Sequence, residues 1–450
     1  MIRAKAALAR SIGRMSRATG RGGGTTLPGR VLLRLDPDAI DKLGSGFERG
    51  STLISATNGK TTTASMLATI LNAQGRHPVH NRAGSNMTWG VATALLEQKG
   101  DEGLFEVDEA WLPEVARRLA PGTILLGNLF RDQLDRYGET EALADAWAEM
   151  AVSMAGTTSF VLNADDPLVA DIGRFSAGPT TYFGIEDNTQ ALDEIQHASD
   201  AKQCRVCGAG LRYERAFVGH LGHYGCPSCG LKRPVPDVGA TEVTLLGMDG
   251  LEATVVSADS SARLKLPLPG LYNLYNALAA IATAQTLGVP VADSIDALSS
   301  MKAVFGRVER IRIGPTELSI LLVKNPAGAN EVLRTLGLEP GPLKLWLALN
   351  DGIADGRDVS WIWDADFELL AERVDSFVCT GTRAPEMALR LKYAGWPEQR
   401  LTVVRDIARS LEVALEGGPE KVFALPTYTA LLELRELLAD RSNAGRYWQS

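Results

Sequence analysis

Residues 51–75 have the sequence STLISATNGKTTTASMLATILNAQG, and this stretch decides the fold. Its first six residues are rich in β-branched and apolar side chains and predict a strand, whereas residues 60–75 predict a helix that ends at a glycine. A polar turn that contains Gly59 and Lys60 joins the two. Such a turn can hold phosphate oxygens, because its backbone amides and the N-terminus of the helix both face the anion.

The turn departs from the full phosphate-loop signature at one position, since Ile54 stands where the signature has its first glycine. We still expect nucleotide phosphates to bind here, with Lys60 reaching the β- and γ-phosphates and the Thr61 hydroxyl holding Mg²⁺. The alternative is an ordinary strand-to-helix turn. The candidate nucleotide contacts in the turn are Thr57, Asn58, Gly59, Lys60, Thr61 and Thr62.

Short β-rich runs alternate with helical stretches along most of the chain. GLFEVDEA, TILLGN and TSFVLNADDP follow the first unit, and a second series from about residue 312 contains LSILLV, LKLWLAL, DSFVCTG, LTVVRD and KVFALP. This alternation predicts an α/β fold with mostly parallel sheets.

The chain of 450 residues carries 46 Lys and Arg against 54 Asp and Glu, so its net charge is −8. This balance argues against a protein that coats nucleic acid through its overall charge. The exception is segment 1–22, whose six basic residues without an acid leave −14 for the rest of the chain: Arg3, Lys5, Arg10, Arg14, Arg17 and Arg21.

Segment 1–22 predicts an amphipathic helix, with most of its arginines on one side and Leu8, Ile12 and Met15 opposite. One interpretation is a helix docked on the next domain with a solvated basic face. The others are contact with anionic lipid head groups, which would hold a cytoplasmic protein at the inner face of the membrane, and a transit peptide. The repeated arginines are unlike the continuous apolar region of a secretory signal, and no run of 18 apolar residues predicts a membrane span.

Four of the five cysteines form two C-x-x-C pairs, CRVCG and CPSCG, with 18 residues between them. This spacing predicts a structural Zn²⁺ site, and the glycine after each pair allows the tight turn of a zinc knuckle. Disulfides or a redox-active pair are the alternatives. His220 and His223 are surplus to a complete ligand set, and we expect them to pack in the ribbon or lie on its surface. The expected ligands are Cys204, Cys207, Cys226 and Cys229.

Five motifs in a fixed order connect the phosphate turn to a known family. They are TNGKTT (57–62), NLFRDQLDRYG (128–138), LNADDP (162–167), GLYNLYNALAA (270–280) and GRVE (306–309). In order and spacing they resemble the ATP-dependent Mur ligases and folylpolyglutamate synthases. The resemblance implies a central ATPase domain at 43–311, with the zinc ribbon inserted at about 195–235, and a C-terminal Rossmann-like domain at 312–450. The basic helix and a linker would occupy 1–42.

Within that family, the cysteine insertion and the segments KNPAG (324–328) and NDGIADGRDVSWIWD (350–364) resemble the MurT family, the synthetase subunits of lipid II isoglutaminyl synthase. This resemblance implies that ATP activates the α-carboxylate of D-glutamate in the lipid II stem peptide as an acyl phosphate. Ammonia from a GatD-type glutaminase subunit then converts it to an amide. The expected partners are therefore that subunit, in a heterodimer, and lipid II, without nucleic acid.

The resemblance also implies roles for residues outside the turn. Glu106, at the end of a predicted strand, is expected to coordinate Mg²⁺, with Asp108 and Glu109 as alternatives. Asn276 would contact adenine, and Arg307 would contact the phosphates or the ribose. For these last two, an ordinary hydrogen bond within a helix or turn is the alternative.

Glutamine hydrolysis needs a nucleophilic cysteine with a nearby base. Outside the predicted zinc site only Cys379 remains, in an apolar run where a buried structural thiol is expected, so a partner must supply the ammonia. By the resemblance, Asp358 orients the catalytic histidine of that partner. Asp351 and Asp355 are nearby alternatives, as is a simple Asx turn.

Two other functions fit parts of the sequence. A Mur-type or folylpolyglutamate-type ligase would add an amino acid, but neither the cysteine insertion nor the DGRDVSW segment is expected in one. About 50 residues precede the phosphate turn, which is too few for the domain that holds a UDP-linked precursor. A zinc-ribbon NTPase that binds nucleic acid would need a more basic chain and ribbon.

Overall fold

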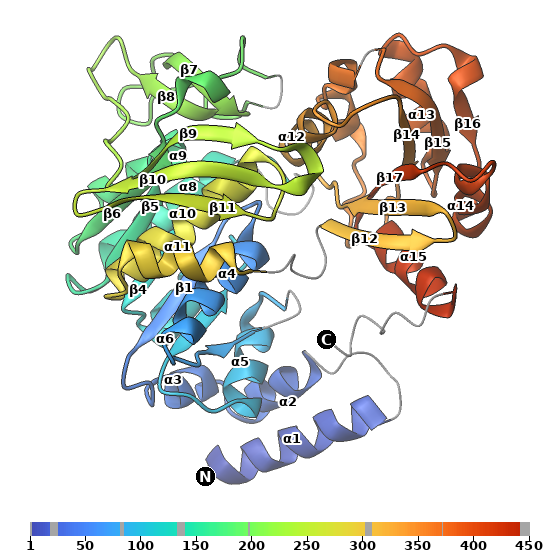
Figure 1. The fold of residues 1–450 in the computed structure, drawn as a ribbon. Coiled ribbons are helices and arrows are strands. Elements are labelled where there is room, and N and C mark those ends of the chain that lie inside the picture. Colours follow the sequence, from blue (N-terminus) through green and yellow to red (C-terminus); the bar gives the residue numbers. More distant parts are fainter. Residues whose placement is uncertain are drawn as a thin grey trace.

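Two sheets with helices on both faces organise the chain in the computed structural model (Figure 1). The structure describes residues 2–18, 26–81, 85–132, 140–196, 199–301, 308–370 and 372–441. Both sheets are mainly parallel, so the α/β fold predicted from the alternating pattern is confirmed.

The larger, central sheet has nine strands in the order β11-β10-β9-β6-β5-β4-β1-β3-β2. Seven neighbouring strands, from β2 to β9, are parallel, and two antiparallel strands complete one edge. The strands are β1 (Ser51–Ser55), β2 (Val79–His80), β3 (Gly103–Glu106), β4 (Thr123–Leu126), β5 (Ser159–Asn163), β6 (Thr180–Ile185), β9 (Val238–Leu245), β10 (Leu251–Ser257) and β11 (Ser261–Leu266).

Helices cover both faces of the central sheet. Successive side chains of β1 point to opposite faces, so Leu53 packs in one hydrophobic cluster and Ile54 in the other. Ile54 meets the cluster built around α4 (Lys60–Ala73), α10 (Leu271–Thr286) and α11 (Val291–Ser299). The cluster on the other face involves α5 (Thr88–Glu97), α6 (Leu112–Leu119), α8 (Thr140–Ser153) and α9 (Pro167–Ala170). Burial on both faces explains why the strands are continuous apolar runs.

The predicted strand-turn-helix unit is confirmed, because β1 ends at Ser55 and α4 begins at Lys60. Gly59 has φ +94°, a left-handed conformation that L side chains rarely adopt. A Cβ atom at this position would also lie only 2.0 Å from Asn276 Oδ1. Glycine is therefore required here both by the backbone and by the close approach of α10.

The smaller sheet has the order β12-β13-β17-β14-β15-β16. Only the β12–β13 pair is antiparallel. Its strands are β12 (Val308–Ile313), β13 (Thr316–Leu321), β14 (Leu343–Ala348), β15 (Val374–Thr380), β16 (Leu401–Val403) and β17 (Lys421–Pro426), and its helices are α12 (Pro326–Leu336), α13 (Ala384–Tyr393), α14 (Ile407–Leu415) and α15 (Tyr428–Arg441). All five strands predicted after residue 312 are present, and α12 lies on the side that faces the central sheet (Figure 1).

Short elements complete the architecture. Strands β7 (Arg212–Val218) and β8 (Leu221–Gly225) form a separate antiparallel hairpin above the central sheet (Figure 1). The 3₁₀ helices are η1 (Asp171–Arg174), η2 (Asn188–Gln190), η3 (Gly247–Asp249), η4 (Ser360–Trp363), η5 (Phe367–Leu370) and η6 (Glu398–Arg400).

The N-terminal helix α1 (Ile2–Ala18) docks on α2 (Leu27–Leu35), α3 (Ala39–Gly44) and α5 through small residues. Ala6 and Ala9 are buried, and Gly13 lies so close to Pro28 that a Cβ would be 2.5 Å from Pro28 Cγ. Of the apolar face expected from the sequence, Ile12 is half-buried, but Leu8 and Met15 are 52% and 68% exposed. That face is therefore not the centre of the docking contact.

Two basic residues of α1 also take part in this docking. Arg10 Nε donates to Leu96 O at 2.8 Å, and Lys5 Nζ lies 3.3 Å from Asp36 Oδ2. Arg3 and Arg14 remain exposed. Among the described residues, no helix combines the length and apolarity that crossing a membrane requires.

Candidate active site

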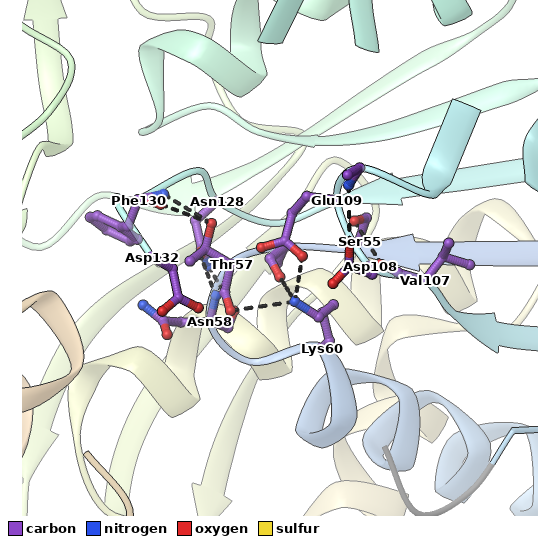
Figure 2. A network of polar contacts seen from close by, with 12 residues as sticks. Ser55, Thr57, Asn58, Lys60, Val107, Asp108, Glu109, Asn128, Phe130 and Asp132 are labelled. Atoms are coloured by element: carbon purple, nitrogen blue, oxygen red, sulfur yellow. Dashed lines mark hydrogen bonds and ion pairs between the residues drawn. The ribbon is translucent and has the colours of Figure 1, made fainter. Parts of the chain in front are cut away.

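The turn between β1 and α4 is held in shape by the segment that follows β4. The backbone N–H groups of Thr57 and Asn58 donate to the carbonyl and the side-chain oxygen of Asn128, both at 2.9 Å. Phe130 N donates to Thr57 Oγ1 at 3.0 Å (Figure 2). The first amides of α4 have no acceptor within the helix, so the fixed turn presents N–H groups to an anion.

Lys60 forms a buried ion pair that the sequence did not identify. Its ammonium Nζ lies 2.7 Å from Glu109 Oε2, and the side chains are 10% and 9% exposed (Figure 2). Burial opposes both charges, but their mutual attraction and hydrogen bond raise the pKa of Lys60 and lower the pKa of Glu109. Glu109, one of the alternative magnesium ligands, is thus engaged by the lysine.

Glu106 is the last residue of β3 and lies at the carboxyl end of the strands, where the phosphate turn also lies, because its register partner on β1 is Ile54. Asn81 fixes its backbone: Asn81 Nδ2 donates to Glu106 O at 2.8 Å, and Glu106 N donates to Asn81 Oδ1 at 2.9 Å. Thr61 lies in the first turn of α4 and is half-buried. A carboxylate and a hydroxyl are oxygen ligands of the kind Mg²⁺ prefers, so the residues present fit the predicted ion.

The segment that begins α12 reaches the phosphate turn from the second sheet. Asn325 Nδ2 donates to Asn58 Oδ1 at 3.0 Å, and Lys324 Nζ donates to Thr57 O at 3.3 Å. Lys324 also pairs with Asp132. Asn325 caps α12 by accepting from Gly328 N at 2.9 Å, so one side chain both starts the helix and holds it against the turn.

A cavity lies beside the turn and is lined by residues of the central domain and of α12. Its walls are mainly apolar and aromatic, with a few polar groups at defined places. The lining comprises Asn58, Gly59, Asn128, Phe130, Val218, Leu221, Tyr272, Tyr275, Asn276, Leu322, Lys324, Ala327, Gly328, Glu331 and Val332. This composition is typical of a small-molecule site.

Asn276 lies where the resemblance placed it, on α10 and in the wall of this cavity. Its side chain donates to Asn273 Oδ1 at 3.1 Å and accepts from Thr63 Oγ1 at 3.2 Å. The first is the bond within a helix of the alternative interpretation, and the second joins α10 to α4. Contact between Asn276 and adenine stays a prediction. Arg307 lies outside the described residues.

The sequence analysis missed two groups of cavity residues. One is Glu331, for which the KNPAG segment at the start of α12 was the only signal. The other is the tip of the β7–β8 hairpin, where Val218 and Leu221 face the cavity. Nothing in the local pattern of either segment connects it with residues more than 100 positions away.

The three candidate aspartates of the 350–364 segment, Asp351, Asp355 and Asp358, have different surroundings. Asp351 pairs with Arg383 at 2.7 Å, and the buried Asp355 accepts from Thr429 N at 2.8 Å. Asp358 is exposed. Its Oδ1 accepts from Ser360 N at 2.8 Å, and this bond holds the pKa of Asp358 below its ordinary value. Asp358 therefore forms the Asx turn of the alternative interpretation and still presents an ionised carboxylate on the surface.

The four paired cysteines converge as the spacing predicts, since their sulfur atoms all lie within 4.8 Å of one another. Gly208 and Gly230, which follow the pairs, have φ +73° and +77° with open space around a Cβ, so the turn itself requires glycine. The cluster is compatible with a bound metal ion.

The two histidines of the ribbon pack instead of joining the cluster. His220 is fully buried, its Nε2 lies 3.4 Å from Asp166 Oδ2, and its ring is 4.6 Å from that of Phe130. His223 Nε2 lies 2.8 Å from Ile185 O. The hairpin tip is thus anchored in the central domain next to the cavity. Cys379 is buried in β15, and burial raises the pKa of its thiol to about 12.

Comparison with known proteins supports this architecture. Residues 54–224 match the Mur ligase middle domain, and residues 322–431 match the MurT ligase C-terminal domain. The chain is 34% identical, over 93% of both chains, to the lipid II isoglutaminyl synthase (glutamine-hydrolyzing) subunit MurT of Streptococcus pneumoniae. It is 33% identical to the subunit of the same name from Staphylococcus aureus, over 97% of this chain and 98% of the relative.

Among solved structures, a pseudomurein peptide ligase type C from Methanothermus fervidus superposes with a TM-score of 0.70 at 25% identity. The match covers 89% of this chain and 81% of that chain. Together these comparisons confirm the Mur ligase-type fold that the five ordered motifs predicted.

Proposed function

The chain belongs to the MurT family of lipid II isoglutaminyl synthase subunits, and from this membership we propose how its site amidates the stem peptide of lipid II. The reacting group is the α-carboxylate of D-glutamate, and the product is D-isoglutamine. The observation that carries the proposal is the hydrogen-bonded phosphate turn with Lys60 at the carboxyl end of β1, beside a cavity that α12 helps to line.

Amidation requires activation, because a carboxylate is a poor electrophile. One carboxylate oxygen attacks the γ-phosphorus of ATP, the bond to the β–γ bridging oxygen breaks, and ADP leaves. Ammonia then attacks the carbonyl carbon of the acyl phosphate, loses a proton and expels phosphate. Negative charge accumulates during the first step, so the site must mainly position and neutralise the phosphates.

The residues around the turn fit this task. The amides at the start of α4 and the Lys60 ammonium would hold the β- and γ-phosphates. Thr61 and Glu106 would hold Mg²⁺, which when bound neutralises phosphate charge. Asn276 would contact the base. ATP and Mg²⁺ follow from the Mur ligase fold, whereas these residue assignments are part of the proposal.

Ammonia is proposed to come from a GatD-type glutaminase bound as a heterodimer. Of the three candidate aspartates, Asp358 lies exposed, whereas Asp351 pairs with Arg383 and the buried Asp355 bonds to Thr429. An exposed, ionised carboxylate can accept a hydrogen bond from a histidine of the other subunit and fix its tautomer. This supports Asp358 as the residue that completes the glutaminase site.

Two further assignments concern structure and location. Zn²⁺ is the metal proposed for the four-cysteine cluster, in a structural role, because four thiolates leave no open ligand position. We also propose that α1 lies against the inner leaflet, since Leu8, Met15, Arg3 and Arg14 are exposed on it and the substrate is a lipid.

The test is an amidation assay with the full chain, a GatD-type glutaminase, lipid II and MgATP, with glutamine or ammonium as the nitrogen source. ATP-dependent amide formation is expected from both sources. Glu106→Ala should abolish both, whereas Glu114→Ala, a surface acid on α6, should change neither. Incorporation of an amino acid in place of ammonia would contradict the proposal and favour an amino-acid-adding ligase.

A further inference from the structure

Glu331, on α12, is a buried acid without a hydrogen-bonding partner in the described part of the chain. Its side chain is 1% exposed, and neither carboxyl oxygen accepts a hydrogen bond. Leaving a buried polar group unsatisfied costs stability, so native structures keep few of them. The same carboxyl group lines the cavity beside the phosphate turn.

The nearest cation does not satisfy this acid. Arg334 Nη1 lies 3.8 Å from Glu331 Oε1, which is too long for a hydrogen bond. The guanidinium of Arg334 instead donates to Phe217 O at 3.1 Å and to Gln190 O at 2.9 Å. Arg334 thus ties α12 to the ribbon hairpin and the central domain, and the Glu331 carboxyl is left for a ligand.

The geometry of the cavity indicates which part of a nucleotide would meet Glu331. Asn58 and Gly59 line the cavity, whereas Lys60 and Glu106 are not among its lining residues. Phosphates on the turn amides and Lys60 would therefore leave the nucleoside in the cavity. Asn325 touches the turn, and Glu331 lies six residues farther along the chain, about 9 Å at the rise of an α-helix.

We propose that Glu331 selects the base of the nucleotide: its carboxyl group accepts a hydrogen bond from the exocyclic amine of a 6-aminopurine. This inference rests on the proposed function, because it presupposes that ATP binds on the turn. Asn276 is the other polar group proposed at the base, but its amide already bonds to Asn273 and Thr63. Much of the rest of the wall is apolar or aromatic, including Tyr272, Leu221 and Val332, which suits a flat heterocycle. Such walls give affinity for any purine, so a polar group must supply the discrimination.

The chemistry of the acid matches adenine in a second way. Burial raises the pKa of Glu331 to about 7, with Arg334 opposing the shift. A protonated carboxyl group carries one O–H donor besides its acceptor oxygen. It can therefore accept from the amine at C6 and donate to N1, the same pairing that a glutamine amide would offer.

The test compares ATP with purine riboside 5′-triphosphate, which lacks only the amine, as ligands of the full chain in the presence of Mg²⁺. Dissociation constants are measured for the wild type, Glu331→Leu and Glu331→Gln. The wild type is expected to bind ATP with a dissociation constant about tenfold lower or more, because a buried hydrogen bond to an ionisable group typically changes affinity by this factor. Glu331→Leu should reduce this ratio to near one, and Glu331→Gln should keep it.

A second readout separates a ligand-binding role from a structural one. Glu331→Leu removes an unsatisfied acid and should raise the melting temperature of the free protein while ATP affinity falls. The matched control is Glu339→Gln, because Glu339 is also buried but accepts from Met248 N and Lys421 outside the cavity. This control should leave the ligand ratio unchanged.

Two results would overturn the inference while leaving the proposed function intact. One is a wild-type protein that binds both triphosphates equally well. The other is a Glu331→Leu protein that keeps the wild-type preference for ATP. A wild-type protein that binds neither triphosphate would instead overturn the proposed function, and the role of Glu331 with it.

Discussion

Replacing Lys60 should destabilise the protein as well as inactivate it, because the lysine neutralises a buried acid. Lys60 Nζ lies 2.7 Å from Glu109 Oε2, and Asp108 and Asp132 also favour its charged form. In Lys60→Met the ammonium is lost, but Glu109 stays buried among like charges. Breaking a buried pair in this way typically costs 3–5 kcal/mol, so we expect about 3 kcal/mol, since Lys324 still offsets part of the charge.

The double variant Lys60→Met/Glu109→Gln separates the two effects. It removes both charges and keeps the shapes of the side chains, so its free energy of unfolding should return to within about 1 kcal/mol of the wild type. Its activity should not return, because the phosphates still lack the lysine. The assays are urea unfolding followed by circular dichroism, and ATP-dependent amidation with ammonium.

Two observations would refute this reasoning. A Lys60→Met protein as stable as the wild type would show that Glu109 is not left as a buried, uncompensated charge. A double variant with normal amidation would remove Lys60 from the chemistry. Glu109→Gln alone is the companion measurement, and it should cost less, because a buried lysine without a partner can lose its proton.

Four further outcomes are expected. Asp358→Asn should suppress amidation with glutamine and spare amidation with ammonium, measured in parallel on the heterodimer, whereas equal loss from both sources would place Asp358 in the ligase site. Cys204→Ser should reduce bound zinc, measured by elemental analysis, and lower stability by several kcal/mol, whereas Cys379→Ser should leave the zinc content unchanged. Arg14→Glu should weaken binding to vesicles with anionic lipid, measured by co-sedimentation, by about tenfold for a reversal of one charge, and leave turnover of a water-soluble stem peptide unchanged. As the pH rises from about 4.5 to about 7, the wild type should lose roughly 3 kcal/mol of stability relative to Glu331→Gln, because in that window the Glu331 carboxyl group ionises mainly in the unfolded protein. The measurement is the urea midpoint of both proteins at pH 4.5 and at pH 7. Midpoints that change in parallel in the two proteins would contradict the prediction.

Local patterns determined most of what the sequence predicted correctly. The strand, the glycine turn and the helix of residues 51–75 depend on neighbours within a few positions, as do the two zinc knuckles. The later strands were recognisable because a parallel sheet covered on both faces needs continuous apolar runs. In these segments the local preference and the tertiary environment agree.

The N-terminal helix shows where periodicity is not enough. Its large apolar residues predicted the docking face, yet Ala9 and Gly13 make the contact. Small side chains let two helices approach closely. The area of their contact then depends on the surface of the partner helix at Pro28 and Leu32, and the periodicity of α1 gives no information about that surface. Leu8 and Met15 are consequently on the outside.

The acids of the site illustrate the same limit in electrostatic terms. Three acids, Glu106, Asp108 and Glu109, occur within four positions at the end of β3. The sequence cannot rank them, because their roles depend on which one a distant cation reaches. Helix α4 places Lys60 next to Glu109, so this candidate magnesium ligand is engaged in an ion pair. Glu106 lies at the carboxyl end of β3, near the phosphate turn. Glu331 is the opposite case. The nearest cation, Arg334, donates its hydrogen bonds to carbonyl oxygens of the central domain, so the Glu331 carboxyl group has no hydrogen-bonding partner in the cavity wall. Whether a carboxylate serves folding or a ligand is thus decided by where the nearest cations are already engaged.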